Sequence, residues 1–242
     1  MLVREGFDST ARLRVSAIVP TLNEAEEVQR ALHSLRLAGV DEIVVVDAGS
    51  SDATVGRATP LADVVLHESG GLFAQLNRGA AEASGDVLIF HYADVEFPVV
   101  GRSAVAAVLS RPTVVGGAFR LAFTSPTMVY RLIARGAHVR NRLRLGPFGD
   151  QSIFVRADAF REMSGFRVDS FLEDLQFVQR LRQRGRFEML EACVRASVRR
   201  WERMGVLKTL LNHWWLSALY VVGKRRQRST AAVRATELRR VR

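Results

Sequence analysis

The sequence predicts an α/β fold in which helices flank a mostly parallel central sheet. Short runs of apolar, mostly β-branched residues alternate with segments whose apolar residues recur at helical spacing. The runs are apolar on both faces, which is typical of parallel strands that helices cover from two sides. The chain has 242 residues, 48% hydrophobic and 25% charged, so it suits one large α/β domain and not a disordered or fibrous protein.

The first half of the chain repeats a strand–helix pattern. Residues 14–19 form a β-branched run that ends at Pro20, and the stretch from Glu24 to Leu37 has the apolar spacing of a helix. We expect further buried strands at residues 42–46, 63–67 and 86–90.

The second half is more mixed. Strands are expected at residues 115–121 and 152–155, and helices at 126–143 and 172–184. Residues 205–222 predict an amphipathic helix with a broad apolar face, whose continuous apolar part is shorter than the roughly 20 residues of a membrane span.

The positive charge of the chain is concentrated at its C-terminal end. The formal net charge is +10, but residues 223–242 hold eight basic residues against the single acid Glu237 and account for +7 of it. Nucleic-acid binding by the folded body is therefore not expected.

Cys193 is the only cysteine, which excludes an intrachain disulfide framework and a cysteine-cluster metal site. The first fifteen residues carry no apolar segment typical of a signal peptide, and we expect a cytoplasmic protein.

Polar residues follow the first two predicted strands, in the stretches PTLNE and DAGSSDAT. Ligands bind at such carboxyl ends of parallel strands. Asp47 ends an apolar strand and is placed to reach a base edge, although it is also explained as an ordinary loop acid. Asn23 and Glu24 are expected to cap the helix that follows them. Ser50 and Asp52 precede the next helix, where they serve either as plain N-caps or as part of an anion site.

These stretches resemble the family 2 glycosyltransferases, whose nucleotide-sugar domain opens with Pro-x-x-Asn-Glu and continues with Asp-x-Gly-Ser-x-Asp-x-Thr. The subgroup that the chain resembles most is the arsenosugar-biosynthesis glycosyltransferases. The likeness runs from Val15 to about Gly223 and continues through the blocks GLFAQLNRGAAEASGDVLIFHYADVEFP, GAFRL, GPFGDQSIFV, GFRVDSFLEDLQFVQRLRQRG and SVRRWERMG.

The resemblance implies a GT-A fold, the nucleotide-diphospho-sugar transferase fold, in one domain over residues 1–222. The nucleotide-binding half would span about 14–98 and the acceptor half about 99–222, followed by a flexible basic tail at 223–242. The implied activity is that of a hexosyltransferase that moves a sugar from a nucleotide-diphospho-sugar, a UDP-sugar, to an acceptor hydroxyl with inversion.

The resemblance also implies a donor site and a metal. Asp47 would bond the uracil ring, and Asp94 would hold Mg²⁺ or Mn²⁺ against the diphosphate. Two residues depart from the subgroup pattern: Tyr92 stands where a histidine is usual, and Leu72 where an arginine is common. The other residues implied in nucleotide-sugar binding are Pro20, Thr21, Asn23, Glu24, Gly49, Ser50, Asp52, Gly71 and Asn77.

For catalysis, the resemblance points to Glu173 and Asp174 at the start of a predicted helix. Asp174 is the expected base that removes the acceptor proton, with Glu173 orienting it or contacting the acceptor. Adjacent acids at such a position also act simply as helix-dipole partners. The implied acceptor-binding residues are Asp150, Gln151, Arg200 and Trp201, for which a turn and an interface clamp are the plain structural alternatives.

Two other classes of protein compete with an enzyme that takes a nucleotide-sugar donor and an acceptor not identified by the sequence. One is a degenerate relative that binds a nucleotide sugar without turnover, which Tyr92 and Leu72 favour. The other is a basic module that contacts nucleic acid or an anionic membrane surface, at the inner face, through residues 205–242. The second alternative is compatible with an enzyme.

Overall fold

The computed structural model describes residues 12–168 and 172–205. The chain divides into two compact units, Met1–Ser197 and Val198–Arg242. In the second unit the described part is short and contains helix α8 (Arg199–Met204). The expected helix at 205–222 and the expected tail at 223–242 lie almost entirely outside the described residues, and the domain boundary between them stays a prediction.

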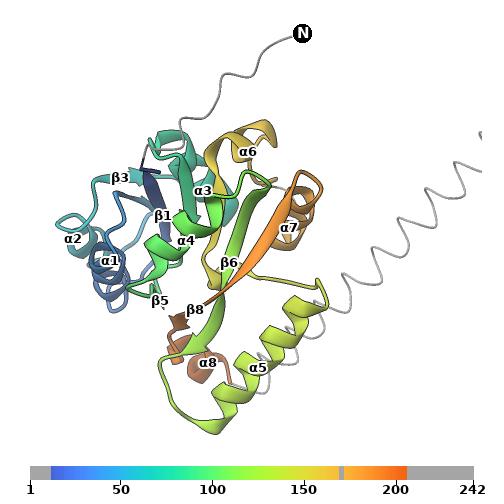
Figure 1. The fold of residues 1–242 in the computed structure, drawn as a ribbon. Helices are drawn as coiled ribbons and strands as arrows, with labels where there is room; N and C mark the ends of the chain where they lie inside the picture. The colour runs from blue at the N-terminus through green and yellow to red at the C-terminus, as the bar shows by residue number, and fades with distance from the viewer. Residues whose placement is uncertain (1–11, 169–171, 206–242) are drawn as a thin grey trace, which may run out of the picture. The chain divides into compact units, whose positions relative to one another are not determined.

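The first unit is built on one eight-stranded sheet (Figure 1). The strands follow one another across the sheet in the order β3-β2-β1-β4-β7-β6-β8-β5. Their bounds are β1 Val15–Thr21, β2 Glu42–Asp47, β3 Val64–His67, β4 Val87–Phe90, β5 Val95–Glu96, β6 Val114–Phe123, β7 Ile153–Arg156 and β8 Arg186–Ala196.

Strand direction differs between the two halves of the sheet. β1 pairs in parallel with β2 and β4, and β2 pairs in parallel with β3. β7 then runs antiparallel to both β4 and β6, whereas β6 and β8 are parallel and run side by side (Figure 1). The parallel half is the one that the sequence predicts most clearly, and the mixed half is the one that it predicts loosely.

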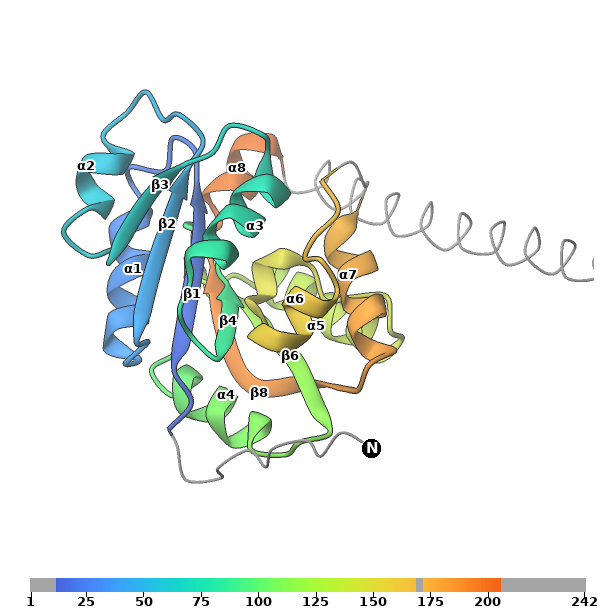
Figure 2. The same ribbon diagram turned by 90° about the horizontal axis from the view of Figure 1, so that it is seen from above.

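Helices cover both faces of the sheet, as the apolar strands predict. On one face, Leu32 and Leu35 of α1 pack into the same core as Val19, Ile43 and other alternate strand residues. On the other face, α3 packs against Ile18, Val44 and Val46, so α1 and α3 lie on opposite sides of β1 and β2 (Figure 2). The helices of this unit are α1 Val28–Leu37, α2 Thr54–Ala58, α3 Leu72–Glu82, α4 Gly101–Leu109, α5 Met128–Arg142, α6 Ala157–Glu162 and α7 Glu173–Arg182, with a short 3₁₀ turn, η1, at Gly149–Gln151.

The sequence pattern did not predict strand β8. Its sequence, RFEMLEACVRA, is rich in residues that favour helices, and no strict alternation marks a buried face. The pairing of Val114–Phe123 with this segment over most of its length holds it extended, so tertiary contacts override local propensity. In the described part of the chain, no helix is long and apolar enough to cross a membrane.

Candidate active site

The site lies where the carboxyl ends of the parallel strands meet. β1 and β2 end opposite each other, with Thr21 beside Asp47. β4 ends at Phe90, and because β7 runs antiparallel to it, β7 begins at Ile153 directly opposite Phe90. The segments after β1, β2 and β4 and the turn before β7 therefore share one edge of the sheet, the usual place for a ligand in such folds.

The two polar stretches after β1 and β2 are held together by hydrogen bonds. The Asn23 side-chain oxygen accepts from the Ser51 N–H at 2.9 Å, and the Asn23 N–H donates to the Ser50 hydroxyl at 2.9 Å. The Glu24 N–H donates to the Thr54 hydroxyl at 2.8 Å. Asn23 and Glu24 thus join the two loops, and they do not cap α1, whose N-terminus has no side-chain cap.

Asp52 stabilises the second of these loops from within. Its carboxylate accepts the backbone N–H groups of Thr54 at 3.0 Å and of Ala25 at 3.2 Å. The hydrogen bond from the Thr54 hydroxyl is the main reason that the pKa of Asp52 lies below its usual value. These hydrogen bonds from backbone N–H groups to the Asp52 carboxylate fix the loop that leads into α2.

Asp47 is almost fully buried and accepts four hydrogen bonds. Its carboxylate receives the Thr21 hydroxyl at 2.9 Å, the Ser50 hydroxyl at 2.5 Å, and the N–H groups of Gly49 and Ser50 at 2.8 and 2.7 Å. Burial alone would raise the pKa of Asp47, but these bonds outweigh it and lower the pKa. Because a carboxylate offers about four acceptor positions, a base N–H must displace one donor, and a hydroxyl rotates away most easily.

Two glycines and a glutamine set the backbone conformation and hydrogen bonding at this edge of the sheet. Gly49 and Gly71 have φ angles of +94° and +92°, which other residues rarely adopt, and Gly71 directly precedes α3. Buried Gln75 of α3 donates to the carbonyl oxygens of Thr21 at 3.1 Å and Val46 at 2.7 Å. Sequence analysis missed Gln75, although its place in the block GLFAQLN next to the candidate residues is a usable signal. Pro20 lies in β1 beyond the last pair with β4, so its lack of an N–H disrupts no bond to that strand.

Asn77 lies on α3 and serves a loop of the second half. Its amide donates to the Phe166 carbonyl at 2.8 Å and accepts the Phe166 N–H at 2.9 Å. Both ends of the side chain are therefore engaged with the segment that leads toward α7. In this geometry Asn77 positions the loop, and its predicted contact with the nucleotide stays a prediction.

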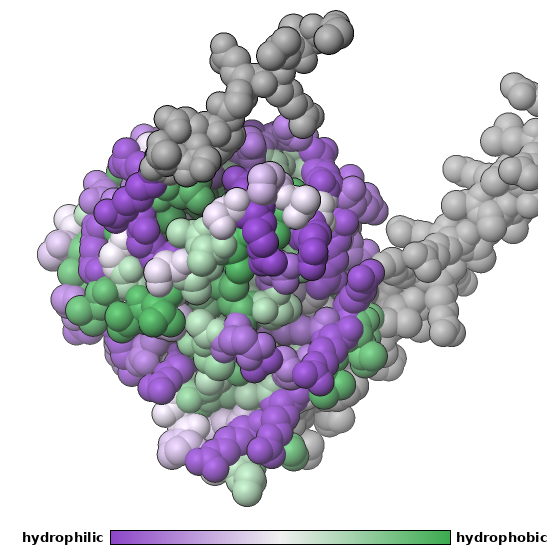
Figure 3. Space-filling model, in the orientation of Figure 1, coloured by the Kyte–Doolittle hydropathy of each residue, from purple (hydrophilic) through white to green (hydrophobic). Residues whose placement is uncertain are grey.

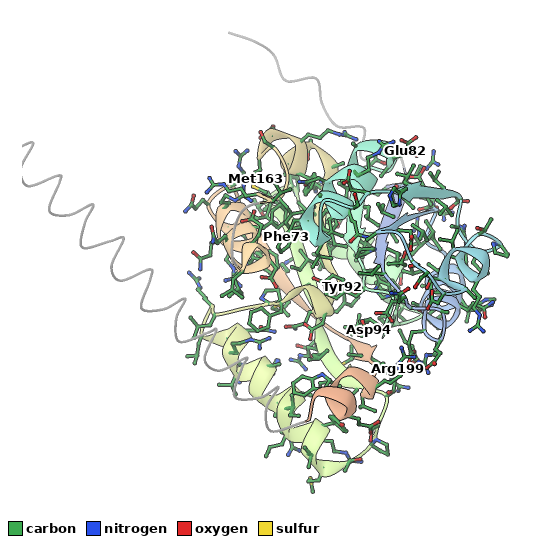
Figure 4. All side chains as sticks on the ribbon, turned by 180° about the vertical axis from the view of Figure 1, so that it is seen from behind. Phe73, Glu82, Tyr92, Asp94, Met163 and Arg199 are labelled. Carbon is green, nitrogen blue, oxygen red and sulfur yellow. The ribbon has the colours of Figure 1, made fainter. Side chains whose placement is uncertain are left out.

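The loop after β4 carries the candidate metal ligand. His91 is fully buried between the Ser152 hydroxyl at 2.8 Å and the Val95 carbonyl at 2.9 Å, and burial lowers the pKa of His91 to about 4. The imidazole is therefore neutral and held by the protein. Asp94 follows, half-buried, and Figure 4 shows Tyr92 and Asp94 in the middle of that side of the molecule. Within the described ranges, no group of three or more acidic, histidine or cysteine residues is arranged to hold a metal ion.

Tyr92 connects the Asp94 loop to the candidate base. A Cβ added at Gly149 would overlap the Tyr92 ring and hydroxyl, so the tyrosine packs directly on the Gly149 backbone. The Gly149 N–H in turn donates to the Asp174 carboxylate at 3.1 Å. The loop after β4, the turn before β7 and the start of α7 are thereby packed into one continuous structure.

The adjacent acids Glu173 and Asp174 have different surroundings. Glu173 is fully buried, forms an ion pair with Arg180 and accepts the Arg167 N–H at 2.8 Å. Asp174 is half-buried, and desolvation raises its pKa to about 6. The charge of Asp150 raises it further, whereas the N–H groups of Leu175 and Gly149 lower it. A carboxylate with a pKa near 6 is suited to take a proton near neutral pH.

The four candidate acceptor residues belong to two different units of the chain. Asp150 lies within electrostatic range of Asp174, on the turn that holds it. Gln151 is fully buried, donates to the Phe119 carbonyl at 2.8 Å and accepts from Asn141 at 3.2 Å, so its side chain is used to join α5 to the sheet. Arg200 and Trp201 belong to α8 in the second unit, and their role in acceptor binding stays a prediction.

The sequence profile of Glycosyl transferase family 2 matches residues 16–169. A dolichol-phosphate mannosyltransferase of Pyrococcus furiosus is 36% identical over 95 residues, which are 36% of this chain and 27% of that protein. The fold is similar to a mannosyltransferase from Pyrobaculum calidifontis, solved with GDP-Man and Mn²⁺ (TM-score 0.59, 21% identity, 79% of this chain and 59% of the other). It is also similar to glucosyl-3-phosphoglycerate synthase from Mycobacterium tuberculosis, solved with Mn²⁺, UDP and glucosyl-3-phosphoglycerate (TM-score 0.56, 20% identity, 80% and 77%).

The fold is that of the GT-A class, as the resemblance implied. The chain belongs to glycosyl transferase family 2. Its match spans about a quarter of the curated mannosyltransferase.

Proposed function

We propose that this protein is a glycosyltransferase that moves a sugar from a nucleotide-diphospho-sugar to an acceptor hydroxyl. Family membership supports the class of reaction. The observation that carries the proposal is the placement of Asp174. This acid has a pKa raised to about 6 and is joined through Gly149 and Tyr92 to the loop that bears Asp94.

The donor would bind across the edge formed by β1, β2 and β4. Asp47 and the loops joined by Asn23 would hold the nucleoside, with the carboxylate accepting a base N–H in place of an internal hydroxyl. We propose a UDP-sugar, because uracil offers an N–H to such an acceptor. Relatives of the same fold have been solved with GDP-Man and with UDP, so the choice of base needs a direct test.

Asp94 would ligate Mg²⁺ or Mn²⁺ together with the donor diphosphate. One carboxylate fits Mg²⁺ sites that take their remaining ligands from substrate phosphates and water. His91 is not available as a second ligand, because both ring nitrogens are engaged inside the protein. When bound, the cation would offset the negative charge that develops on the leaving diphosphate.

The chain's own contribution to the transfer would be to take the acceptor proton. Asp174 is the group that would accept it, while the acceptor oxygen attacks the anomeric carbon from the face opposite the diphosphate, with inversion. Glu173 would act indirectly, because its ion pair with Arg180 and its bond to the Arg167 N–H hold the chain that leads to Asp174.

A donor screen tests this proposal. UDP- and GDP-sugars, with and without Mn²⁺, are added to the full chain and the unfolding temperature is measured, because a ligand that binds only the folded state raises it. We expect a nucleotide sugar to stabilise the wild type more with Mn²⁺ than without it. The metal-dependent part should be absent in Asp94→Asn, and Mn²⁺ alone should have little effect. If no nucleotide sugar changes the unfolding temperature, the proposal fails.

A binding protein without turnover is the second candidate, and Tyr92 in place of the usual ligand favours it. A donor-hydrolysis assay that measures release of the nucleotide diphosphate distinguishes an enzyme from a binding protein. The enzyme consumes the donor, and the binding protein does not. The likeness to the arsenosugar subgroup, transfer of a hexose, a cytoplasmic location and a membrane contact through residues 205–242 stay predictions.

A further inference from the structure

Arg140 is a half-buried cation near the candidate base, and the sequence motifs did not single it out. It lies near the end of α5, and the block GPFGDQ that follows wraps around it. Its guanidinium stacks on the Phe148 ring, with the carbon 3.8 Å from the ring centroid. A Cβ added at Gly146 would lie in close contact with the Arg140 Nε. A terminal nitrogen of the Arg140 guanidinium donates a long hydrogen bond of 3.4 Å to the Gln151 side-chain oxygen.

The guanidinium makes few hydrogen bonds for a group with five donors. Its Nε is buried and has no hydrogen-bond partner among the described residues. Burial lowers the pKa of Arg140, and the two groups whose charges counter that effect are Asp150 and Asp174. The arginine thus bears a desolvation cost that the charges of two carboxylates offset.

The geometry links Arg140 to Asp174 by a short path as well as by charge. Phe148, on which the arginine stacks, is followed by Gly149, whose N–H binds the Asp174 carboxylate. Asp150 follows on the same turn and repels Asp174. Tyr92 packs on Gly149, and Glu173, the sequence neighbour of Asp174, is paired with Arg180.

We propose that Arg140 is a positioning residue that fixes the turn at Gly149 against Asp174 and keeps the Asp174 carboxylate in its charged form beside Asp150. This inference rests on the proposed function, in which Asp174 must be unprotonated to accept the acceptor proton. Without the arginine, only the N–H groups of Leu175 and Gly149 would oppose the burial of Asp174 and the repulsion from Asp150. The base would then be protonated over part of the neutral pH range.

The test is a titration of Asp174 that needs no substrate. Carbon-13 labelling of aspartate carboxyls gives one signal per residue, and Asp174→Asn identifies the signal of Asp174. Arg140→Met removes the charge but keeps a side chain that packs on Phe148, whereas Arg140→Lys keeps the charge. Arg135→Gln is the matched control, since Arg135 is exposed on the same helix, where Figure 3 shows a hydrophilic band along α5.

We expect Arg140→Met to move the Asp174 titration upward by about one pH unit, the smaller end of the effect of an adjacent opposite charge. Arg140→Lys should move it less, and Arg135→Gln should leave it in place. An unchanged titration in a folded Arg140→Met protein overturns the inference, as does an equal shift in Arg135→Gln. If Arg140→Met does not fold, an Arg140→Lys titration equal to the wild type supports the role of charge, and a shift as large as one unit opposes it.

The same variants separate this inference from the proposed function. If Asp174→Asn consumes the donor at the wild-type rate, the proposed function fails whatever Arg140 does to the titration. If Asp174→Asn is inactive, the rate of donor consumption is measured against pH. The pH at which this rate falls on the acid side should rise in Arg140→Met, together with the pH midpoint of the Asp174 titration. If Arg140 has only a structural role, Arg140→Met should lower the unfolding temperature and leave unchanged the pH at which the rate falls on the acid side.

Discussion

The buried imidazole of His91 makes the stability of the fold depend on pH. The pKa of His91 is lowered from 6.5 to about 4 because burial disfavours the charged form, and the Val95 carbonyl only partly opposes this. An unfolded chain binds this proton below about pH 6.5, whereas the folded chain binds it only near pH 4. The stabilisation is therefore fully present above pH 6.5 and is lost as the pH falls toward 4.

The size of the effect follows from the two pKa values. A difference of about 2.5 units corresponds to about 3 kcal/mol at pH 4, at 1.36 kcal/mol per unit. His91→Asn removes the titrating group and keeps a polar atom near Ser152. Urea unfolding of both proteins at pH 8, 6 and 4 gives the difference in free energy at each pH, in which other titrating groups cancel.

We expect His91→Asn to be less stable than the wild type at pH 8, because the bond to the Val95 carbonyl is lost. This deficit should shrink by about 3 kcal/mol between pH 8 and pH 4. A deficit for His91→Asn that does not change with pH would refute a neutral buried imidazole.

Further predictions concern the two halves of the site. Asp47→Ala should weaken UDP binding by about 1–3 kcal/mol, the scale of a charged hydrogen bond, and calorimetry showing unchanged affinity in a folded protein would remove Asp47 from the donor site. Gly149→Ala should lower the unfolding temperature because its Cβ meets Tyr92, and Tyr92→Ala should restore part of the loss; a strictly additive double mutant would argue against this contact. Glu173→Gln should destabilise the fold by about 3 kcal/mol in urea unfolding, since Arg180 is left without its charged partner, and a fully stable variant would contradict the structural role of the pair.

Much of the first half could be predicted from sequence because its strands are buried on both faces. Residues such as Ile43 and Val44 face opposite cores, so both must be apolar, and continuous apolar runs follow. β8 could not be predicted in this way, because helix-favouring residues are held extended by pairing with β6. The second half lacks the local signals because its order is set by contacts distant in sequence.

The sequence motifs indicate which segments carry the candidate residues, but not the direction in which every side chain points. Asp47, Asp94 and Asp174 follow from motifs at strand and helix ends, and the structure brings their segments to one edge. A motif does not say which way an amide points, and both Asn77 and Gln151 turn out to bind the backbone of neighbouring segments. Their roles are visible only when distant loops are packed together.

The most direct test of the account is single-turnover consumption of the identified donor by Asp174→Asn, measured together with donor affinity. The variant keeps the size of the side chain but cannot take a proton. We expect the rate to fall by about 10²- to 10⁴-fold, the usual cost of a lost base, while donor affinity stays the same. Wild-type activity should itself decline below about pH 6, where Asp174 becomes protonated. An Asp174→Asn protein that turns over normally, or a larger loss in Glu173→Gln, would contradict the assignment of Asp174 as the base.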